Sequence, residues 1–130
     1  MKLSELNKIS KIVLDAAIEV HRQLGPGLLE SVYEKCLSKE LSFREIENQM
    51  QVSFPLFYKQ ASLDASFRID MIVAKELFVE IKAVEQVLPV HRAQLLSYLR
   101  LANKRLGILI NFNVPKLIEG WERIINGYDE

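Results

Sequence analysis

The 130-residue chain has a single cysteine, Cys36, and no apolar run long enough to cross a membrane. One cysteine cannot form a disulfide within the chain. No histidine or acidic residue stands at a telling spacing from it, so the pattern predicts a packed core residue and not a nucleophile. The first ten residues, MKLSELNKIS, lack the apolar segment of a secretory signal. These absences lead us to expect a protein of the reducing cytoplasm.

The chain also lacks an excess of charge of either sign, because 17 Lys and Arg residues are balanced by 17 Asp and Glu residues. Without an overall positive field it cannot hold duplex DNA by counterion release over a broad surface, so any nucleic-acid contact must come from a local patch. No zinc finger, helix-turn-helix or other base-reading motif is present. The length and an apolar content of 49% predict one globular domain over residues 1–130.

Two strand-like runs between Phe67 and Lys82 carry charges in otherwise apolar sequence. Apolar residues alternate in both runs, and only Ala74-Lys75-Glu76 separates them, which predicts a β-hairpin. If both apolar sets face one core, the hairpin must pair residues of equal parity, for example Val73 with Leu77. The expected core-facing set is Phe67, Ile69, Met71 and Val73 in the first run and Leu77, Val79, Ile81 and Ala83 in the second.

The same pairing places Asp70 opposite Glu80, with Lys82 beside them on the face that points away from the predicted core. Desolvating charges is costly, so charged residues are seldom placed in apolar strands without partners. Two carboxylates and one amine leave a negative charge uncompensated, and a cation would balance it. The sequence therefore predicts a metal site. Arg68, on the same face, is an alternative partner for Asp70, or a contact for a substrate phosphate.

Mg²⁺ suits this donor set, with Mn²⁺ as a substitute, because it takes hard oxygen ligands and keeps several waters. We expect Asp70 and Glu80 to be direct ligands and the main-chain carbonyl of Ile81 to be a third. Lys82 would orient the attacking water or stabilise phosphate charge. Such a site can hydrolyse phosphodiester bonds. The alternative is a buried ion-pair cluster that fixes the strand register.

The remaining elements are predicted from periodicity and breakers. A first helix, capped by Ser4, is expected to end at Gly25-Pro26-Gly27. Pro55 limits a strand over residues 51–59 to an edge or a bulge. Residues 121–125 fit either an edge strand or a short helix. The other expected elements are helices over residues 28–44 and 89–103 and a central strand over residues 106–112.

Two of these helices carry polar residues of interest. In the second helix, Glu30, Glu34 and Lys35 fall outside the apolar stripe or at its margin, and Glu30 needs a reason if it points inward. In the third, Gln94 and Tyr98 share one face with His91, which we expect to be a surface residue. That face is either solvated or turned toward the metal. The expected apolar stripe of the second helix is Leu29, Val32, Cys36, Leu37 and Leu41.

Five blocks follow one another along the chain: GLLESVY at 27–33, RID at 68–70, VEIKA at 79–83, QLLSYL at 94–99 and GILINF at 107–112. In this order they resemble the GxxExxY proteins, a family grouped with the PD-(D/E)XK nuclease superfamily. The resemblance spans nearly the whole chain. It implies an α/β (α+β) fold with a restriction-endonuclease-like core in the order helix-strand-strand-strand-helix-strand. A mixed central sheet flanked by helices, and an extra N-terminal helix, complete that expectation.

The resemblance also implies site residues. Glu30 corresponds to the acidic residue that superfamily members carry on the first core helix, Asp70 to that of the second core strand, and Glu80 with Lys82 to the third-strand pair. Glu30 would then be a third carboxylate near the metal. Without the resemblance, Glu30 is a surface glutamate in the first turn of a helix, where the helix dipole favours a negative charge.

By the same resemblance, Gln94 and Tyr98 match polar positions of the following helix. We expect Tyr33 to pack and hydrogen-bond so that the Gly-Pro-Gly corner and Glu30 stay in place. The implied function is a Mg²⁺-dependent nuclease acting on DNA, with RNA less favoured, and with specificity supplied by a homodimer or a protein partner. Two alternatives stay open: a catalytically silent nucleic-acid- or protein-binding module on the same fold, and a hydrolase of small phosphorylated nucleotides.

Overall fold

A computed structural model describes residues 1–127 of the chain. Five strands form a mixed sheet in the order β1-β2-β3-β4-β5, in which only β3 and β4 run parallel. The predicted α+β fold, with its core order and its extra N-terminal helix, is confirmed. The elements are α1 (Leu3–Leu24), α2 (Glu30–Phe43), β1 (Asn48–Tyr58), β2 (Ala61–Val73), β3 (Leu77–Lys82), α3 (Pro89–Ala102), β4 (Leu106–Asn111), the 3₁₀ helix η1 (Leu117–Gly120) and β5 (Trp121–Ile125).

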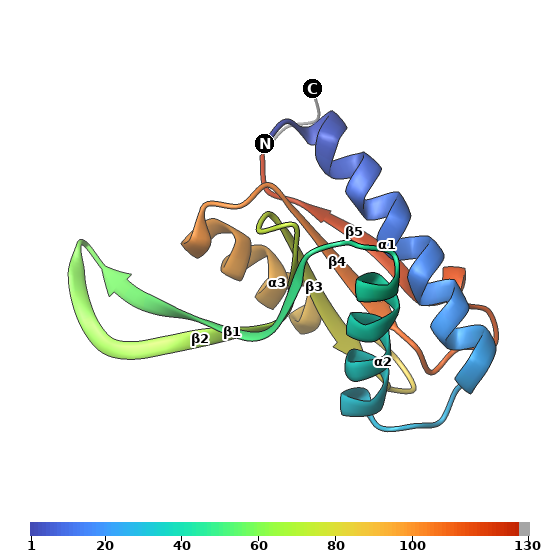
Figure 1. The fold of residues 1–130 in the computed structure, drawn as a ribbon. Coiled ribbons are helices and arrows are strands. Elements are labelled where there is room, and N and C mark those ends of the chain that lie inside the picture. Colours follow the sequence, from blue (N-terminus) through green and yellow to red (C-terminus); the bar gives the residue numbers. More distant parts are fainter. Residues whose placement is uncertain (128–130) are drawn as a thin grey trace.

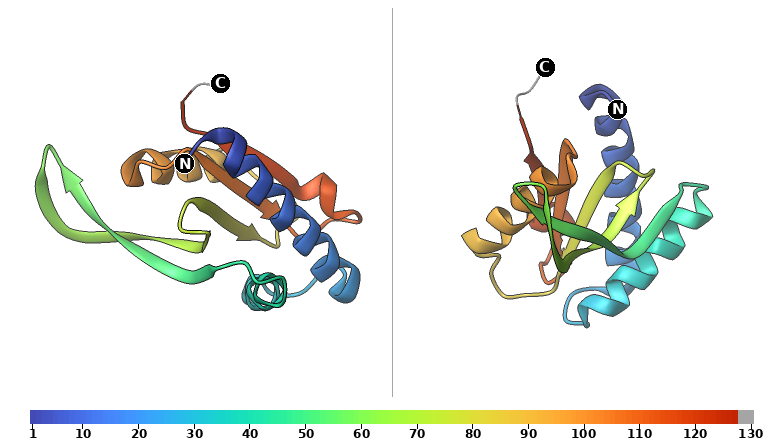
Figure 2. Two further views of the ribbon diagram at one scale, coloured as in Figure 1. Left: turned by 45° about the horizontal axis from the view of Figure 1, so that its top comes forward. Right: turned by 90° about the vertical axis from the view of Figure 1, so that its left-hand side faces the viewer.

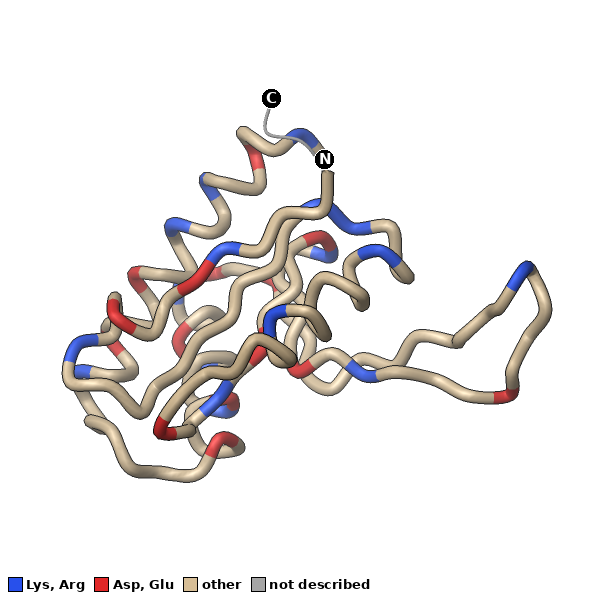
Figure 3. Tube along the Cα trace, turned by 180° about the vertical axis from the view of Figure 1, so that it is seen from behind, with Lys and Arg blue, Asp and Glu red and all other residues tan. Residues whose placement is uncertain are grey.

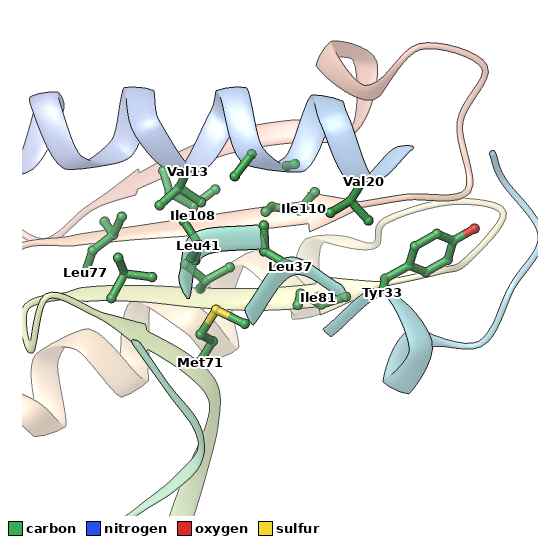
Figure 4. Close-up of a cluster of buried hydrophobic side chains, with 14 of the residues drawn as sticks. Val13, Val20, Tyr33, Leu37, Leu41, Met71, Leu77, Ile81, Ile108 and Ile110 are labelled. Atoms are coloured by element: carbon green, nitrogen blue, oxygen red, sulfur yellow. The ribbon is translucent and has the colours of Figure 1, made fainter. Parts of the chain in front are cut away.

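Helices cover both faces of the sheet (Figure 1). The larger apolar cluster lies between the sheet and helices α1 and α2, and Figure 4 shows Val13 of α1 and Leu41 of α2 meeting Ile108 of β4. The smaller cluster lies between the sheet and α3, where Leu95 and Leu99 pack. All of β4 is buried because both of its faces are covered, as expected for a central strand.

Helix α1 begins two residues earlier than the predicted Ser4 cap implies. Leu3 is its first residue, so Ser4 lies inside the helix and the expected Ser4 cap is wrong. Leu3 is 5% exposed, and burying its side chain in the larger cluster favours the longer helix. The helix ends at Gly25, as predicted, where a φ of 70° requires the left-handed region that glycine tolerates. Among the described residues, no helix has the length and apolar content to cross a membrane.

The buried stripe of α2 differs from the predicted one. Leu29 precedes the helix and is 73% exposed, whereas Glu34 is only 9% exposed. Tyr33, fully buried, stacks on Phe112 with 4.5 Å between ring centroids. With this large ring packed on Phe112, just after β4, the next residue of α2, Glu34, is buried beside it. The residues buried on α2 are Tyr33, Glu34, Leu37 and Leu41.

The two edge strands, β1 and β5, agree with what Pro55 and residues 121–125 predicted. β1 is an edge strand, and its pairing with β2 shifts register between Pro55 and Phe57, so both expectations for Pro55 are confirmed. β1 and β2 project from the body as a two-stranded arm, which Figures 1 and 2 show. Residues 121–125 form strand β5, antiparallel to β4, which decides the alternative that periodicity left open.

The predicted hairpin register is confirmed, because Val73 pairs with Leu77. The expectation of one common core face is wrong, however. Met71 belongs to the larger cluster, whereas Ile69, two residues earlier, belongs to the smaller one, with Phe67. The face opposite the larger cluster is therefore not solvated, because α3, which follows β3, must bury its own apolar residues against it.

Tyr33 provides a test of how the α1–α2 corner is held. Its hydroxyl donates to the carbonyl of Gly25 (2.5 Å) and accepts the N–H of Leu28 (3.1 Å). We expect Tyr33→Phe to lower the free energy of unfolding by about 1 kcal/mol, because two partly buried main-chain groups lose their hydrogen-bond partner. Urea denaturation measures this change. Tyr58→Phe, at an exposed position, is the control and should leave stability unchanged; equal losses in both variants would contradict the role of the corner.

Candidate functional site

The β2–β3 ladder stops where the two predicted carboxylates stand. Its last regular pair is Met71 with Val79. Beyond it, the N–H of Asp70 donates to Oε1 of Glu80 (3.0 Å), and the N–H of Ile81 donates to Oδ2 of Asp70 (2.8 Å). Each carboxylate thus replaces the opposite main chain as acceptor, and the two strands part without leaving an unpaired amide. The predicted proximity of Asp70 and Glu80 is confirmed.

The β1–β2 ladder is interrupted at the same level. Regular pairing skips Gln51 and Asp70, and Gln51 has a φ of 54°, in the left-handed region. On one side of this point Met71 faces α1 and α2; on the other side Val52 and Ile69 face α3. The interruption therefore lets both strands change faces, and it turns the Asp70 side chain toward β3.

Glu80 is buried in a negative environment. It is 7% exposed, and its partner in the parallel ladder, Leu109, belongs to the cluster under α3. Burial first, and the negative charge of Asp70 second, raise the pKa of Glu80 to about 8, while Lys82 lowers it slightly. In the absence of a cation, the carboxyl group of Glu80 therefore carries a proton at neutral pH.

Helix α2 brings a further carboxylate to this region, at a residue that the sequence analysis did not select. Both oxygens of Glu34 accept from Nε2 of Gln51 (2.8 and 2.9 Å), and the same Nε2 lies 3.5 Å from Oδ1 of Asp70. Burial raises the pKa of Glu34 in spite of the Gln51 hydrogen bonds. The position of Glu34 one helical turn after Glu30 was a usable signal. Gln51 offered none, because its role depends on a local break in the strand.

Glu30 lies at the first turn of α2 and contacts the end of β3, where its Oε2 accepts the N–H of Ala83 (3.1 Å). A pocket of about 530 Å³ opens between α2 and the hairpin. Glu30 and Asp70 thus line one pocket, although Glu30 contacts main chain and not the Asp70–Glu80 pair. The lining residues are Leu28, Leu29, Glu30, Ser31, Glu34, Gln51, Asp70 and Ala83.

Of the α3 residues, Tyr98 lies near the pair. Its ring stacks on Phe67 with 4.8 Å between centroids, and burial together with the charges of Glu80 and Asp70 raises the pKa of its hydroxyl. Gln94, one turn earlier, is exposed. His91 is half-buried, and its Nδ1 accepts the Leu88 N–H at the start of the helix (3.0 Å).

Arg68 precedes Asp70 by two residues but acts on a different carboxylate. It is exposed on β2. Its positive charge lowers the pKa of Glu34, against the larger effect of burial. Because β2 changes faces at Asp70, residues at even positions on either side of it no longer point to one face. Arg68 is therefore placed toward the α2 side of the arm.

The oxygen donors of Asp70, Glu80 and Ile81, where β2 and β3 separate, are too few to hold a hard divalent cation unless water molecules complete its ligands. Within residues 1–127, no three His, Cys, Asp or Glu side chains gather closely enough to bind a metal ion. Asp70 and Glu80 each use one oxygen for a main-chain amide, and the second oxygen of Asp70, Oδ1, lies 3.5 Å from Nε2 of Gln51. The Lys82 carbonyl accepts the Phe112 N–H, so by strand alternation the carbonyl of Ile81 points the other way, toward Asp70. Two carboxylates, one carbonyl and waters are a donor set that Mg²⁺ accepts.

The fold and the acidic pair define an α+β protein of the nuclease-like class. A family model described as PD-(D/E)XK nuclease superfamily matches residues 7–124, and the chain belongs to that superfamily, whose nucleases generally use divalent metals. Comparison with curated proteins finds no match. Among solved structures, the chain is similar to that described as "Crystal structure of SSO0001", with 17% identity, a TM-score of 0.48, and coverage of 93% of this chain and 79% of that one.

The raised pKa of Glu80 predicts a pH dependence of stability. The folded protein holds a proton that the unfolded chain releases near pH 4.5, so this stabilisation is complete below pH 4.5 and is lost as pH rises through about 8. Without divalent ions, we expect the free energy of unfolding to fall by a few kcal/mol over that interval. Urea denaturation at a series of pH values measures it.

Glu80→Gln keeps an acceptor for Asp70 and does not titrate, so its pH profile should be flatter and the variant should be more stable than the wild type at pH 8.5. Glu85→Gln, at an exposed position in the β3–α3 loop, is the control and should follow the wild type. A wild-type profile as flat as that of Glu80→Gln would show that the carboxyl group is not desolvated.

Proposed function

We propose that this protein is a Mg²⁺-dependent nuclease that hydrolyses phosphodiester bonds in DNA. The observation that carries the proposal is the Asp70–Glu80 pair, in which two carboxylates meet at the point where β2 and β3 part. Burying two acidic groups together is costly for a structural purpose alone. A dication offsets that cost, and membership of the nuclease superfamily agrees with this chemistry.

In this proposal Oδ1 of Asp70, Oε2 of Glu80 and the carbonyl of Ile81 hold the dication. When bound, Mg²⁺ lowers the pKa of a coordinated water and neutralises phosphate charge. Lys82 continues β3 on the Glu80 side, and its ammonium group orients the attacking water or stabilises the developing charge on phosphate. Glu30, at the other end of the same pocket, orients a further water.

Residues around the pair provide the environment. In the proposal, the ring of Tyr98, which stacks on Phe67, shields the carboxylates from bulk water, and Gln94, exposed on α3, contacts a phosphate oxygen. Arg68, exposed at the base of the arm, is a second candidate for phosphate, since its guanidinium group can form paired hydrogen bonds with two oxygens.

DNA is proposed over other phosphodiesters by resemblance to the nuclease superfamily, whose family model names no substrate. The 17 basic and 17 acidic residues of the sequence cancel, and Figure 3 shows both signs spread over the trace of the described residues. Binding would therefore rely on a few phosphate contacts near the pocket, and it should weaken as salt is raised. Sequence selection would come from a partner protein or from a second copy of the chain.

Cleavage assays test the proposal directly. Purified protein is incubated with single-stranded, duplex and branched DNA, and with RNA, in Mg²⁺ or Mn²⁺. We expect cleavage of at least one of these substrates, and a loss of about 100-fold or more in Glu80→Gln and Lys82→Gln. Lys11→Gln, on the exposed side of α1, is the control and should retain full activity. Intact substrates throughout, or equal cleavage by the wild type and Glu80→Gln, would refute the nuclease assignment.

Calorimetric titration with Mn²⁺ tests the metal site without any substrate. Asp70→Asn should abolish the heat of binding, because the first carboxylate of the pair is lost, while the protein still melts cooperatively. The control is Asp15→Asn, at an exposed position of α1. Heat that persists in Asp70→Asn would place the metal elsewhere.

One observation favours a second candidate function, a catalytically silent module that binds nucleic acid or protein on the same fold. Asp70 and Glu80 meet, but among residues 1–127 no group of three His, Cys, Asp or Glu side chains is arranged to hold a metal ion. In that case wild type would bind DNA in a gel-shift assay, and Glu80→Gln would bind equally well without cleavage by either protein.

A further inference from the structure

Gln51 occupies a backbone conformation that a residue with a side chain rarely adopts. Its φ is 54°, and its place in β1 is the one at which pairing with β2 is interrupted. A glycine would adopt this conformation without strain, whereas other residues pay about 1 kcal/mol or more. A glutamine here indicates that its side chain has a use that offsets this cost.

The carboxamide of Gln51 links two acidic residues on different elements. Its Nε2 donates to both oxygens of Glu34 on α2 (2.8 and 2.9 Å) and lies 3.5 Å from Oδ1 of Asp70 on β2. Glu34 is only 9% exposed, so this hydrogen-bonded carboxylate is a fixed anchor for the carboxamide. A neutral donor between two carboxylates lets them stand close together without a bound cation.

The two oxygens of Asp70 are consequently held from opposite sides. Oδ2 accepts the N–H of Ile81 (2.8 Å), and Oδ1 faces Gln51. A carboxylate with both oxygens restrained keeps one orientation of its side-chain torsions. The three side chains Glu34, Gln51 and Asp70 line the same pocket of about 530 Å³.

We propose that Gln51 is a positioning residue of the site: anchored by Glu34, its carboxamide fixes the orientation in which Asp70 presents Oδ1 to the pocket. Glu34 is its support and does not itself touch the reacting groups. This inference rests on the proposed function, since Asp70 is taken as a ligand of the dication. It adds two residues from α2 and β1 to a site otherwise built from the hairpin.

Mn²⁺ titration of the full chain by calorimetry tests the inference. Gln51→Leu keeps the size of the side chain and removes its donors, and we expect Mn²⁺ affinity to fall by about 10-fold, as for other residues that orient a metal ligand. Gln49→Leu is the matched control, because Gln49 stands two residues earlier on the same strand and is exposed. It should bind Mn²⁺ as the wild type does.

Gln51→Gly separates the side chain from the backbone. It relieves the left-handed strain, so thermal unfolding should occur at an equal or higher temperature than in the wild type, while Mn²⁺ affinity still falls by about 10-fold. Wild-type affinity in Gln51→Gly would show that only the backbone matters and would overturn the inference. This variant also decides the question if Gln51→Leu does not fold.

The Glu34 support is tested by combining variants. With Glu34→Leu as background, Gln51→Leu should cost less Mn²⁺ affinity than it does in the wild type, because the carboxamide has already lost the acceptor that anchors it. Independent, additive losses would overturn the role of Glu34. If the wild type binds no Mn²⁺ at all, the proposed function itself fails; if it binds and Gln51→Leu binds equally well, only the role of Gln51 fails.

Discussion

The exchange of hydrogen bonds between Asp70 and β3 is the interaction on which the candidate site depends. A sheet whose strands part inside the molecule exposes main-chain amides that need acceptors. Here the acceptors are the carboxylates of Asp70 and Glu80. The same two groups thereby complete the hydrogen bonding of the sheet, while the second oxygen of Asp70 faces the carboxamide of Gln51. Structural and chemical roles are combined in one pair, so that neither side chain can be removed without affecting both.

The cost of this arrangement is a concentration of negative charge in a buried place. Burial and the neighbouring Asp70 raise the pKa of Glu80 to about 8, and burial raises that of Glu34. The molecule relieves part of this cost with a neutral donor, Gln51, and part by keeping a proton. In the proposed function, a dication replaces that proton. The left-handed backbone at Gln51 is explained in the same way, because it brings a carboxamide between carboxylates of α2 and β2.

Short-range sequence patterns were enough to predict the β2–β3 hairpin and the acidic pair that it brings together. Alternation and the short Ala74-Lys75-Glu76 connection predicted the hairpin and its register, and that register alone brought Asp70 to Glu80. The single-face expectation failed at Ile69 and Phe67, because a period-two pattern assumes an uninterrupted strand. On α2, the apolar stripe misplaced Leu29 and left Glu34 at its margin, since the orientation of the helix follows from seating Tyr33 against Phe112.

By itself, the sequence determined the order of elements, the pairing of β2 with β3, and the adjacency of the two acidic residues. These depend on neighbours along the chain, whose side chains alternate with fixed geometry. Only the tertiary structure decided that α3 covers the Glu80 face, that both strands of the arm change faces at Gln51, and that Glu34 reaches the site from α2. Such contacts join residues far apart in sequence, and they are set by how large side chains pack between helices and sheet.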